Sequence, residues 1–477
     1  MVDIAVVGAG VAGLTTALLC SGTGRSVLVL EADRIGSGTT SQSTVKVTAG
    51  HGTKYAELVK RHGADAARTY AESNSWGLGE IVRLVEELEI DCDLERVDHC
   101  LWADSDEEVT TLREEMQAEL DAGLTPELRE EFGLPFPVAS GFALPNQALF
   151  HPKKYLLGLA RAVEGAGGRI VEGTRVEQVQ KKSDSHVLVT PSGNVEAEQV
   201  VLASHAPITD DGLMFTRYVP RMEYAIAARV RAAVPTAAFI SAGHPLRSLR
   251  AVESGGERLL IVVGEGHKVG EEEDTLAPYR ALATWTDDRF GLEDVVYRWC
   301  THDLWPVDGI PLMGRMEGIE RRYVLTGFGA WGMTNATAGA AIIQALISGK
   351  THPWEPLFAP SRHHVRGGVA TFATENIKAV AGHLIGDRLR SLPSDPRNLG
   401  PDEAGIFRVS GERVAAYRDT EGKLCAVSAV CTHVRCVVAW NPAERTWDCP
   451  CHGSRFAVQG DVISGPATKS LKAIRVE

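Results

Sequence analysis

The chain has 477 residues, of which 44% are hydrophobic and 23% charged, a composition typical of soluble globular proteins with two to four domains. Its formal net charge of −13 argues against a nucleic-acid partner, because such a partner requires a basic surface. The apolar stretch 4–20 contains three glycines, follows Asp3, has no Lys or Arg before Arg25 and is short for a membrane span, which together argue against a membrane span or a signal peptide. We therefore expect a cytoplasmic protein with no membrane span.

The first predicted elements form a dinucleotide-binding unit. Residues 4–7 are a short apolar strand, residues 8–13 follow as a Gly-x-Gly-x-x-Gly turn, and residues 14–20 are typical of a packed helix. Residues 26–30 then form a second buried strand. A glycine turn is informative only between a strand and a helix, and here it has both neighbours.

Each glycine of this turn has a physical role. Gly8 permits the tight turn, Gly10 lets the backbone approach a pyrophosphate, and Gly13 lets the helix lie close to the strand. The helix N-terminus then faces the phosphates with its partial positive charge. Glu31 follows the second strand, where its carboxylate can accept hydrogen bonds from ribose hydroxyls. The pattern predicts a bound dinucleotide.

The loop 36–48 is small and rich in hydroxyl groups, including those of Thr40 and Thr44. Such a loop can donate many hydrogen bonds without bulk. It could be an ordinary surface loop, but its place beside a nucleotide-binding turn favours contact with the cofactor.

The middle of the chain alternates helices and strands. We expect helices within 55–88, 105–120 and 153–166, and strands at 169–172 (continued by 174–176), 187–190 and 200–203. Strands at 224–231 and 258–263 predict a second, mostly antiparallel region that would form a substrate domain.

A third segment enters a glycine-rich turn at a helix start. Residues 323–335 contain a buried strand and this turn, and an alanine-rich helix continues to Ile347. A proline-marked boundary follows, then a linker with one predicted helix at 371–390. The last 70 or so residues consist of short β runs, which predicts a small all-β domain.

Five of the nine cysteines lie in one stretch of 27 residues inside this last part. Cys431-x-His433 and Cys449-x-x-His452 offer two thiolates and two imidazoles on two loops. One iron of a [2Fe–2S] cluster would bind the two cysteines and the other iron the two histidines. A structural zinc site could use the same four ligands, but it more often begins with Cys-x-x-Cys and leaves the extra cysteines unexplained. Ser454 could donate a hydrogen bond toward a cluster sulfide.

Two family resemblances follow from these motifs. The glycine turn with Glu31, the loop 44–48 and the segments 146–151, 174–176 and 327–335 resemble the glycine oxidase and D-amino-acid oxidase superfamily of FAD-dependent enzymes. Residues 406–477 look like a Rieske domain of the disulfide-containing type. The resemblance implies an α/β FAD-binding (Rossmann-like) domain with an antiparallel-sheet substrate domain in 1–358, a linker in 359–400, and a small all-β Rieske domain in 401–477.

The resemblance also implies site residues. Val176 would meet the adenine through its backbone, and the whole expected cofactor-binding set is Gly8, Gly10, Gly13, Glu31, Thr40, Thr44, Lys46, Val176, Gly329, Trp331, Gly332, Met333 and Thr334. The cluster ligands would be Cys431, His433, Cys449 and His452, with Cys436 and Cys451 joined in a disulfide. Arg435 and Phe456 depart from the Gly and Tyr usual in high-potential Rieske proteins, which makes respiratory quinol chemistry doubtful.

The resemblance predicts an FAD-dependent oxidoreductase that takes a hydride from an amine or amino-acid-like substrate. Its electrons would pass singly through the Rieske cluster to an external acceptor, which could be a carrier or dioxygen. One alternative is a relay from NAD(P)H to a partner, although the chain has a single convincing nucleotide turn. A Rieske oxygenase is less favoured, because no two of the fifteen histidines are four to six residues apart, as a mononuclear iron site would need.

Five residues are candidates for the substrate face: Lys46, Tyr224, His267, His302 and Trp331. A hydrogen-bonded structural role is an equal alternative for each histidine. Lys46 fits a flavin contact better than a base, and Trp331 fits a pocket wall better than a participant.

Overall fold

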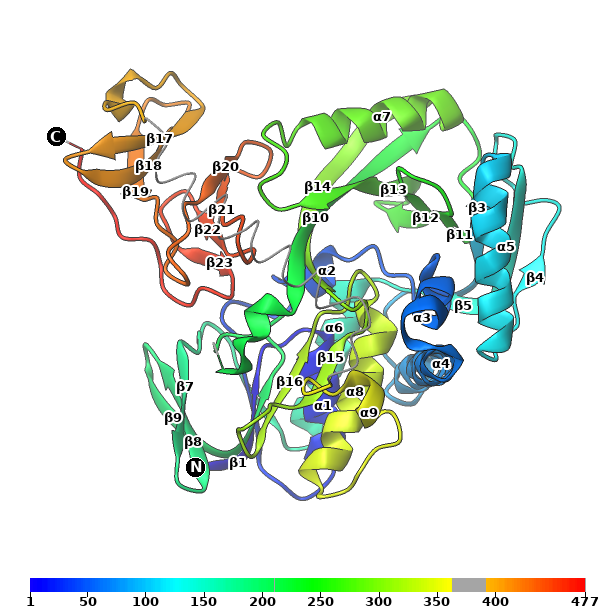
Figure 1. The fold of residues 1–477 in the computed structure, drawn as a ribbon, viewed down its shortest axis with the longest axis horizontal. Coiled ribbons are helices and arrows are strands. Elements are labelled where there is room, and N and C mark those ends of the chain that lie inside the picture. Colours follow the sequence, from blue (N-terminus) through cyan, green and yellow to red (C-terminus); the bar gives the residue numbers. More distant parts are fainter. Residues whose placement is uncertain (210, 363–391, 477) are drawn as a thin grey trace.

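The computed structural model describes residues 1–209, 211–362 and 392–476, which form three parts (Figure 1). The predicted helix at 371–390 lies outside the described residues. No helix in the described ranges combines the length and the apolar character that crossing a membrane requires.

The first part is built on an eight-stranded sheet. Its main path runs β15-β16-β9-β1-β2-β6, with β7 and β8 attached beside β9. The strands are β1 (Val2–Val7), β2 (Val27–Leu30), β6 (Arg169–Val171), β7 (Gln178–Lys182), β8 (Ser185–Thr190), β9 (Gly193–Leu202), β15 (Leu312–Arg315) and β16 (Arg322–Thr326). β1 pairs in parallel with both β2 and β9, as expected of a dinucleotide-binding sheet.

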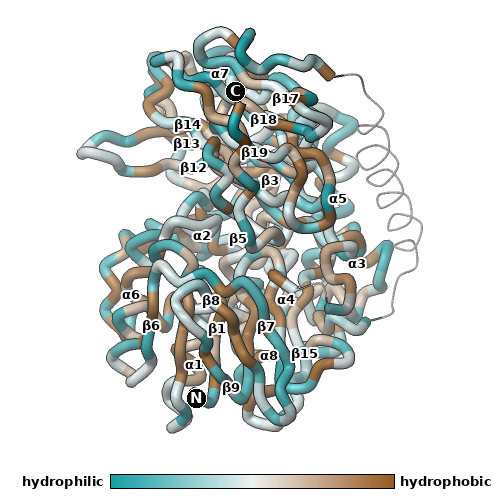
Figure 2. The backbone as a smooth tube through the Cα atoms, turned by 90° about the vertical axis from the view of Figure 1, so that its left-hand side faces the viewer, coloured by the Kyte–Doolittle hydropathy of each residue, from teal (hydrophilic) through white to brown (hydrophobic). Residues whose placement is uncertain are grey.

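Helices cover this sheet because its central strands are apolar on both faces. Ile4, Ala5 and Val6 of β1 are fully buried, and Figure 2 shows the hydrophobic stretches of β1 and α1. The helices of this part are α1 (Val11–Ser21), α2 (Thr39–Gln42), α6 (Pro152–Gly165), α8 (Gly332–Ile347) and α9 (Glu355–Phe358). Burying each large aliphatic side chain stabilises the fold by about 1.5–3 kcal/mol, so this interface is a main source of stability.

The second part is a largely antiparallel sheet of eight strands in the order β14-β10-β13-β12-β11-β3-β5-β4. Its strands are β3 (Glu95–Ala103), β4 (Glu127–Leu128), β5 (Ser140–Leu149), β10 (Tyr218–Val230), β11 (Ala238–Ser241), β12 (Arg247–Ser254), β13 (Glu257–Lys268) and β14 (Leu292–Pro306). Helices α5 (Asp106–Asp121) and α7 (Ala277–Phe290) pack on this sheet. Helices α3 (Lys54–His62) and α4 (Ala64–Glu87) connect it to the first part, because α3 contacts α5 and α4 contacts α8. A 3₁₀ turn at Asp211–Thr216 precedes β10. Helix α7 contacts β10, β13 and β14.

The third part contains two small antiparallel sheets, β17-β18-β19 and β20-β21-β22-β23. The strands are β17 (Glu403–Val409), β18 (Glu412–Arg418), β19 (Leu424–Ser428), β20 (Ala439–Asn441), β21 (Thr446–Asp448), β22 (Arg455–Ala457) and β23 (Val462–Ser464), and a 3₁₀ turn at Pro396–Asn398 precedes them. The expected fold class is confirmed: an α/β nucleotide-binding sheet, an antiparallel sheet and a small all-β unit.

One local prediction is wrong. Residues 174–176 do not continue the strand β6, which ends at Val171. The backbone leaves the sheet there because Gly173 has a positive φ of 63° and its N–H bonds to the Asp33 carbonyl. The segment instead crosses the end of the nucleotide-binding sheet, where Val176 and Arg175 line a cavity.

Candidate functional site

All three parts of the molecule border one cavity of about 1160 Å³. Its walls include the glycine turn after β1, the segment before α8, one face of β10 and β14, and residues 462–465 of the third part. The cavity therefore joins the predicted cofactor and substrate regions with the predicted cluster domain.

At the nucleotide end the wall is mostly backbone. Gly8 has a φ of 103°, and a side chain there would lie 2.6 Å from the Ala203 carbonyl oxygen. A side chain at Gly13 would lie 1.9 Å from the Gly8 carbonyl oxygen, which explains the close approach of α1 to β1. Gly10 lines the cavity and precedes the first residue of α1. The three glycines have the geometry that their spacing predicts.

The side chains beside this turn are hydrogen-bonded to it. Glu31 accepts from the backbone N–H of Ala9 at 2.8 Å, and Thr40 Oγ1 accepts from Val11 N–H at 3.3 Å. The Thr40 hydroxyl therefore accepts from one of the first N–H groups of α1, at the helix end where a phosphate oxygen would also be stabilised. The orientation fits the diphosphate of FAD.

Most of the predicted cofactor-binding residues line this one cavity: Gly8, Gly10, Glu31, Thr40, Thr44, Lys46, Val176, Gly329, Trp331, Gly332 and Met333. Gly13 and Thr334 lie outside the lining. Thr334 is buried and its hydroxyl donates to the Thr48 carbonyl at 3.3 Å, so it joins α8 to the loop 44–48. The N-terminus of α8 points into the cavity, as expected for a helix that faces a flavin.

Lys46 is held inside the protein. Its Nζ donates to the Phe239 carbonyl at 2.8 Å and to the Ser248 hydroxyl. Burial, with a further contribution from the charge of Arg250, lowers the pKa of Lys46 to about 7. The side chain is thus only partly protonated near neutral pH, and its amine is hydrogen-bonded to β11 and β12.

The other catalytic candidates lie around the cavity in different ways. His267, His302 and Trp331 line it, whereas Tyr224 does not and instead bonds through its hydroxyl to His267 Nε2 at 3.0 Å. The ring of Trp331 stacks on His51 with ring centroids 4.3 Å apart. Trp331 therefore forms a wall of the cavity.

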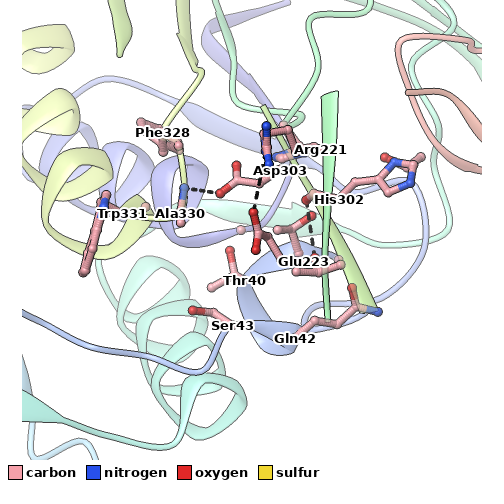
Figure 3. A pocket seen from close by; sticks show the side chains of 18 of the residues that line it. Thr40, Gln42, Ser43, Arg221, Glu223, His302, Asp303, Phe328, Ala330 and Trp331 are labelled. Atoms are coloured by element: carbon pink, nitrogen blue, oxygen red, sulfur yellow. Dashed lines mark hydrogen bonds and ion pairs between the residues drawn. The ribbon is translucent and has the colours of Figure 1, made fainter. Parts of the chain in front are cut away.

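The structure adds three charged residues that the sequence reasoning did not select. Arg221 and Glu223 on β10 and Asp303 on β14 line the cavity together (Figure 3). The sequence offered one signal for such residues: charged side chains at every second position of a largely apolar strand. Alternate residues share one face of a sheet, so such side chains can be expected to lie together.

The predicted cluster ligands also come together. The Cys431 thiol bonds to the side chains of Cys449 and Ser454, and the rings of His433 and His452 have centroids 5.1 Å apart. Nδ1 of His452 is buried and accepts or donates no hydrogen bond within the described ranges. A buried imidazole nitrogen of this kind fits a metal ligand. The predicted disulfide between Cys436 and Cys451 is confirmed.

The cluster loops face the rest of the molecule. The ring of Phe215 packs edge-on against His433 and His452, at centroid distances of 5.2 and 4.7 Å. His302 Nδ1 hydrogen-bonds to the carbonyl oxygen of Gly453, the residue after His452, at 3.0 Å. Burial and the charge of Arg455 lower the pKa of His302, so its Nδ1–H donates from a neutral ring.

Two glycine–proline contacts complete this interface. A side chain at Gly453 would lie 2.7 Å from Pro220 Cβ, and one at Gly270 would lie 2.5 Å from Pro450 Cβ. The second part thus places Gly270 against Pro450 of the third, and the third places Gly453 against Pro220 of the second. Both glycines have a positive φ. The close fit leaves no room for a side chain on either glycine.

Comparison with known proteins decides the family. The profile of the FAD dependent oxidoreductase family matches residues 3–346, and that of the Rieske [2Fe-2S] domain matches residues 394–475. The chain belongs to the FAD-dependent oxidoreductase family. This oxidoreductase binds FAD in its first part and a Rieske [2Fe-2S] cluster in its last part, which confirms both expected cofactors.

One relative covers the whole chain, and others cover most of it. The oxidoreductase is 34% identical to YhfW of Bacillus subtilis (strain 168), named as a Rieske 2Fe-2S iron-sulfur protein, over 100% of this chain and 94% of YhfW. It is 26% identical to gamma-glutamylputrescine oxidoreductase of Escherichia coli (strain K12), over 81% of this chain and 93% of that one. The crystal structure of glycine oxidase from Geobacillus kaustophilus shares its fold, with a TM-score of 0.64 and 20% identity over 76% of this chain and 99% of that chain.

Proposed function

We propose that this oxidoreductase oxidises a small amine or amino-acid-like substrate at FAD and passes the electrons singly through its Rieske cluster to an external acceptor. The name of the Escherichia coli relative, an oxidoreductase of an amine derivative, supports this substrate class. The electron route is supported by the cavity that all three parts of the chain share and by the packing of Phe215 against both cluster histidines.

The residues at each site fit their groups. The glycine turn and the N-terminus of α1 would hold the diphosphate, and residues 329–334 would lie along the flavin ring, which supplies hydride acceptance when bound. Cys431, His433, Cys449 and His452 would hold the cluster, as their convergence and the buried Nδ1 of His452 support.

His302 connects the second part to the cluster loop. His302 lines the cavity on one side and donates to the Gly453 carbonyl on the other. Nearby, Arg455 Nε lies 3.2 Å from Asp448 Oδ1, and both side chains are buried. Although burial acts to raise the pKa of Asp448, the charge of Arg455 and the contact with His302 hold it below its ordinary value. In this proposal His302 is a positioning residue for the cluster loop.

Moving the cluster loop away from the second part, by a substitution at a residue outside both cofactor sites, tests the route. Gly270→Ala would place a methyl group 2.5 Å from Pro450 Cβ, which the present docking cannot accommodate. After anaerobic mixing with substrate, the variant should reduce its flavin at the wild-type rate, whereas the Rieske EPR signal of the reduced cluster should develop at least tenfold more slowly.

Gly255→Ala is the matched control. Gly255 also has a positive φ, 61°, but an added Cβ there meets no atom within 4 Å. The control should keep the wild-type rate of cluster reduction. Equal rates in the Gly270 variant, the control and wild type would contradict the internal route. Prompt flavin reduction by NADH under argon, with none by amines or amino acids, would instead favour the relay from NAD(P)H.

A further inference from the structure

One wall of the cavity carries more acidic than basic groups. Arg221 and Glu223 are alternate residues of β10, and Asp303 of β14 is the cross-strand partner of Arg221. Their side chains consequently share one face of the sheet, and Figure 3 shows the carboxylates of Glu223 and Asp303 together at its centre.

Arg221 balances only part of this charge. Its guanidinium donates to the Gly266 carbonyl at 2.9 Å and lies 5.7 Å from the centre of the Trp305 ring. Its Nε is 4.0 Å from Glu223 Oε1, the limit of an ion pair. Within the described ranges Asp303 forms no ion pair, and it accepts instead from the backbone N–H groups of Leu304, at 2.7 Å, and Ala330. Two carboxylates therefore face one partly engaged guanidinium.

Burial weakens the acidity of both carboxyl groups. Burial raises the pKa of Glu223 to about 7, with Arg221 opposing the rise and Asp303 adding to it. Burial likewise raises the pKa of Asp303 to about 6. A second positive charge in the pocket would stabilise both ionised forms. Lys46 is no such charge, because its Nζ is bound to Phe239 and Ser248.

The acidic pair also lies beside the expected flavin position. Ala330, whose N–H binds Asp303, belongs to the segment 329–334 that we assign to the flavin ring. A group bound by the two carboxylates would thus lie where a hydride donor must lie.

We propose that Glu223 and Asp303 bind the ammonium group of a cationic amine that has no carboxylate on its amine-bearing carbon; this inference rests on the proposed amine oxidation. One of the two carboxylates then accepts a proton as the substrate N–H bond breaks, which leaves the nitrogen lone pair free for oxidation of the adjacent carbon. An α-amino acid would place its carboxylate against two like charges, which this wall disfavours.

A matched pair of unreactive probes tests the charge preference. tert-Butylammonium and pivalate share a tert-butyl group and carry opposite charges. The carbon bonded to nitrogen in the ammonium has no hydrogen, so the probe cannot be oxidised there. Titrated into the FAD-loaded full chain at pH 8, tert-butylammonium should perturb the flavin absorbance at a concentration at least tenfold lower than pivalate. Equal binding of the two probes, or tighter binding of pivalate, would overturn the inference. The wild-type protein alone is enough for this measurement.

Variants assign the effect to the pair. Asp303→Asn and Glu223→Gln should each weaken tert-butylammonium binding at least tenfold, and either variant suffices if the other fails to fold. Glu272→Gln, which changes another acid of the same cavity, should leave the affinity unchanged. The assignment would be contradicted if all three variants lost affinity for tert-butylammonium equally, or if no variant lost affinity.

A reactive pair separates this inference from the proposed function. Propylamine and 2-aminobutanoate differ by one carboxylate on the amine-bearing carbon. Anaerobic flavin reduction by propylamine alone supports the inference, and reduction by 2-aminobutanoate alone overturns it while leaving amine oxidation in place. If neither reduces the flavin, the proposed function loses its support, whereas the tert-butylammonium titration still decides the charge preference.

Discussion

The two ends of the cavity recognise their ligands by different means. At the nucleotide end the wall is made of glycines and backbone N–H groups, and the fit depends on space. At the other end the wall includes the acidic side chains of Glu223 on β10 and Asp303 on β14. The cluster loops lie outside the lining and would bind their cluster through cysteine and histidine side chains. Ligand binding at the first end should therefore be sensitive to added side-chain volume. Ligand binding at the second end should be sensitive to the replacement of single ligand atoms or to the protonation of single carboxylates.

The largest effect expected at the nucleotide end comes from Gly10→Val. The new Cβ would lie 3.0 Å from Thr40 Oγ1 and would fill the approach of the pyrophosphate to α1. We expect colourless protein without FAD, measured by the flavin absorbance of the purified chain. Gly22→Val, at the other end of α1 where an added Cβ meets no atom within 4 Å, should remain yellow. A fully flavinated Gly10 variant would show that this end does not depend on space.

At the cluster end a single atom should matter as much. Cys431→Ser replaces the ligand sulfur by oxygen and should abolish the Rieske EPR signal completely while FAD remains bound. Cys425→Ser is the matched control, because the Cys425 thiol bonds to the Val458 carbonyl rather than to the cluster loops. Persistence of the signal in the Cys431 variant would exclude this cysteine as a ligand.

These two sites were also the ones that the sequence predicted. The glycine turn and the two cluster loops are short contiguous segments, so their residue types and spacing carry the geometry with them. Glu223 and Asp303 are eighty residues apart and meet only because β10 and β14 pair in one register. The contact of Gly270 with Pro450 depends on the docking of two parts, for which neither segment has a local pattern. Even the strand at 174–176 was predicted wrongly, because its apolar residue Val176 is buried against the cavity rather than in the sheet.

Titration should distinguish the two ends by a smaller effect. Glu223 and Asp303, with pKa values of about 7 and about 6, take up protons as the pH falls, and a protonated carboxyl no longer attracts a cation. The affinity for tert-butylammonium, which stays charged in this range, should thus decrease as the pH falls from 8 to 5, by up to about tenfold per pH unit for each proton taken up. The binding of pivalate should change in the opposite direction.

The measurement is a flavin-monitored titration at each pH. In Asp303→Asn the step near pH 6 should disappear. The retention of FAD should vary little over the same range in all variants, since we expect backbone groups to hold the diphosphate. A pH-independent affinity for tert-butylammonium would show that neither carboxylate contacts the probe.

The smallest effect concerns one hydroxyl at the cluster. Ser454 bonds to Cys431 through its side chain, and its Oγ accepts from Ala467 N–H at 3.0 Å, which fixes the direction of the hydroxyl. A hydrogen bond to a ligand sulfur stabilises the more negative, reduced cluster, so Ser454→Ala should lower the midpoint potential. Loss of about 1.4 kcal/mol corresponds to roughly 60 mV for one electron. Ser470→Ala, whose hydroxyl bonds to the exposed Asp461 at 3.2 Å, should leave the potential unchanged in the same redox titration followed by EPR. An unchanged potential in the Ser454 variant would mean that the hydroxyl is directed only at the backbone, and the cluster end would then be tuned by its ligands alone.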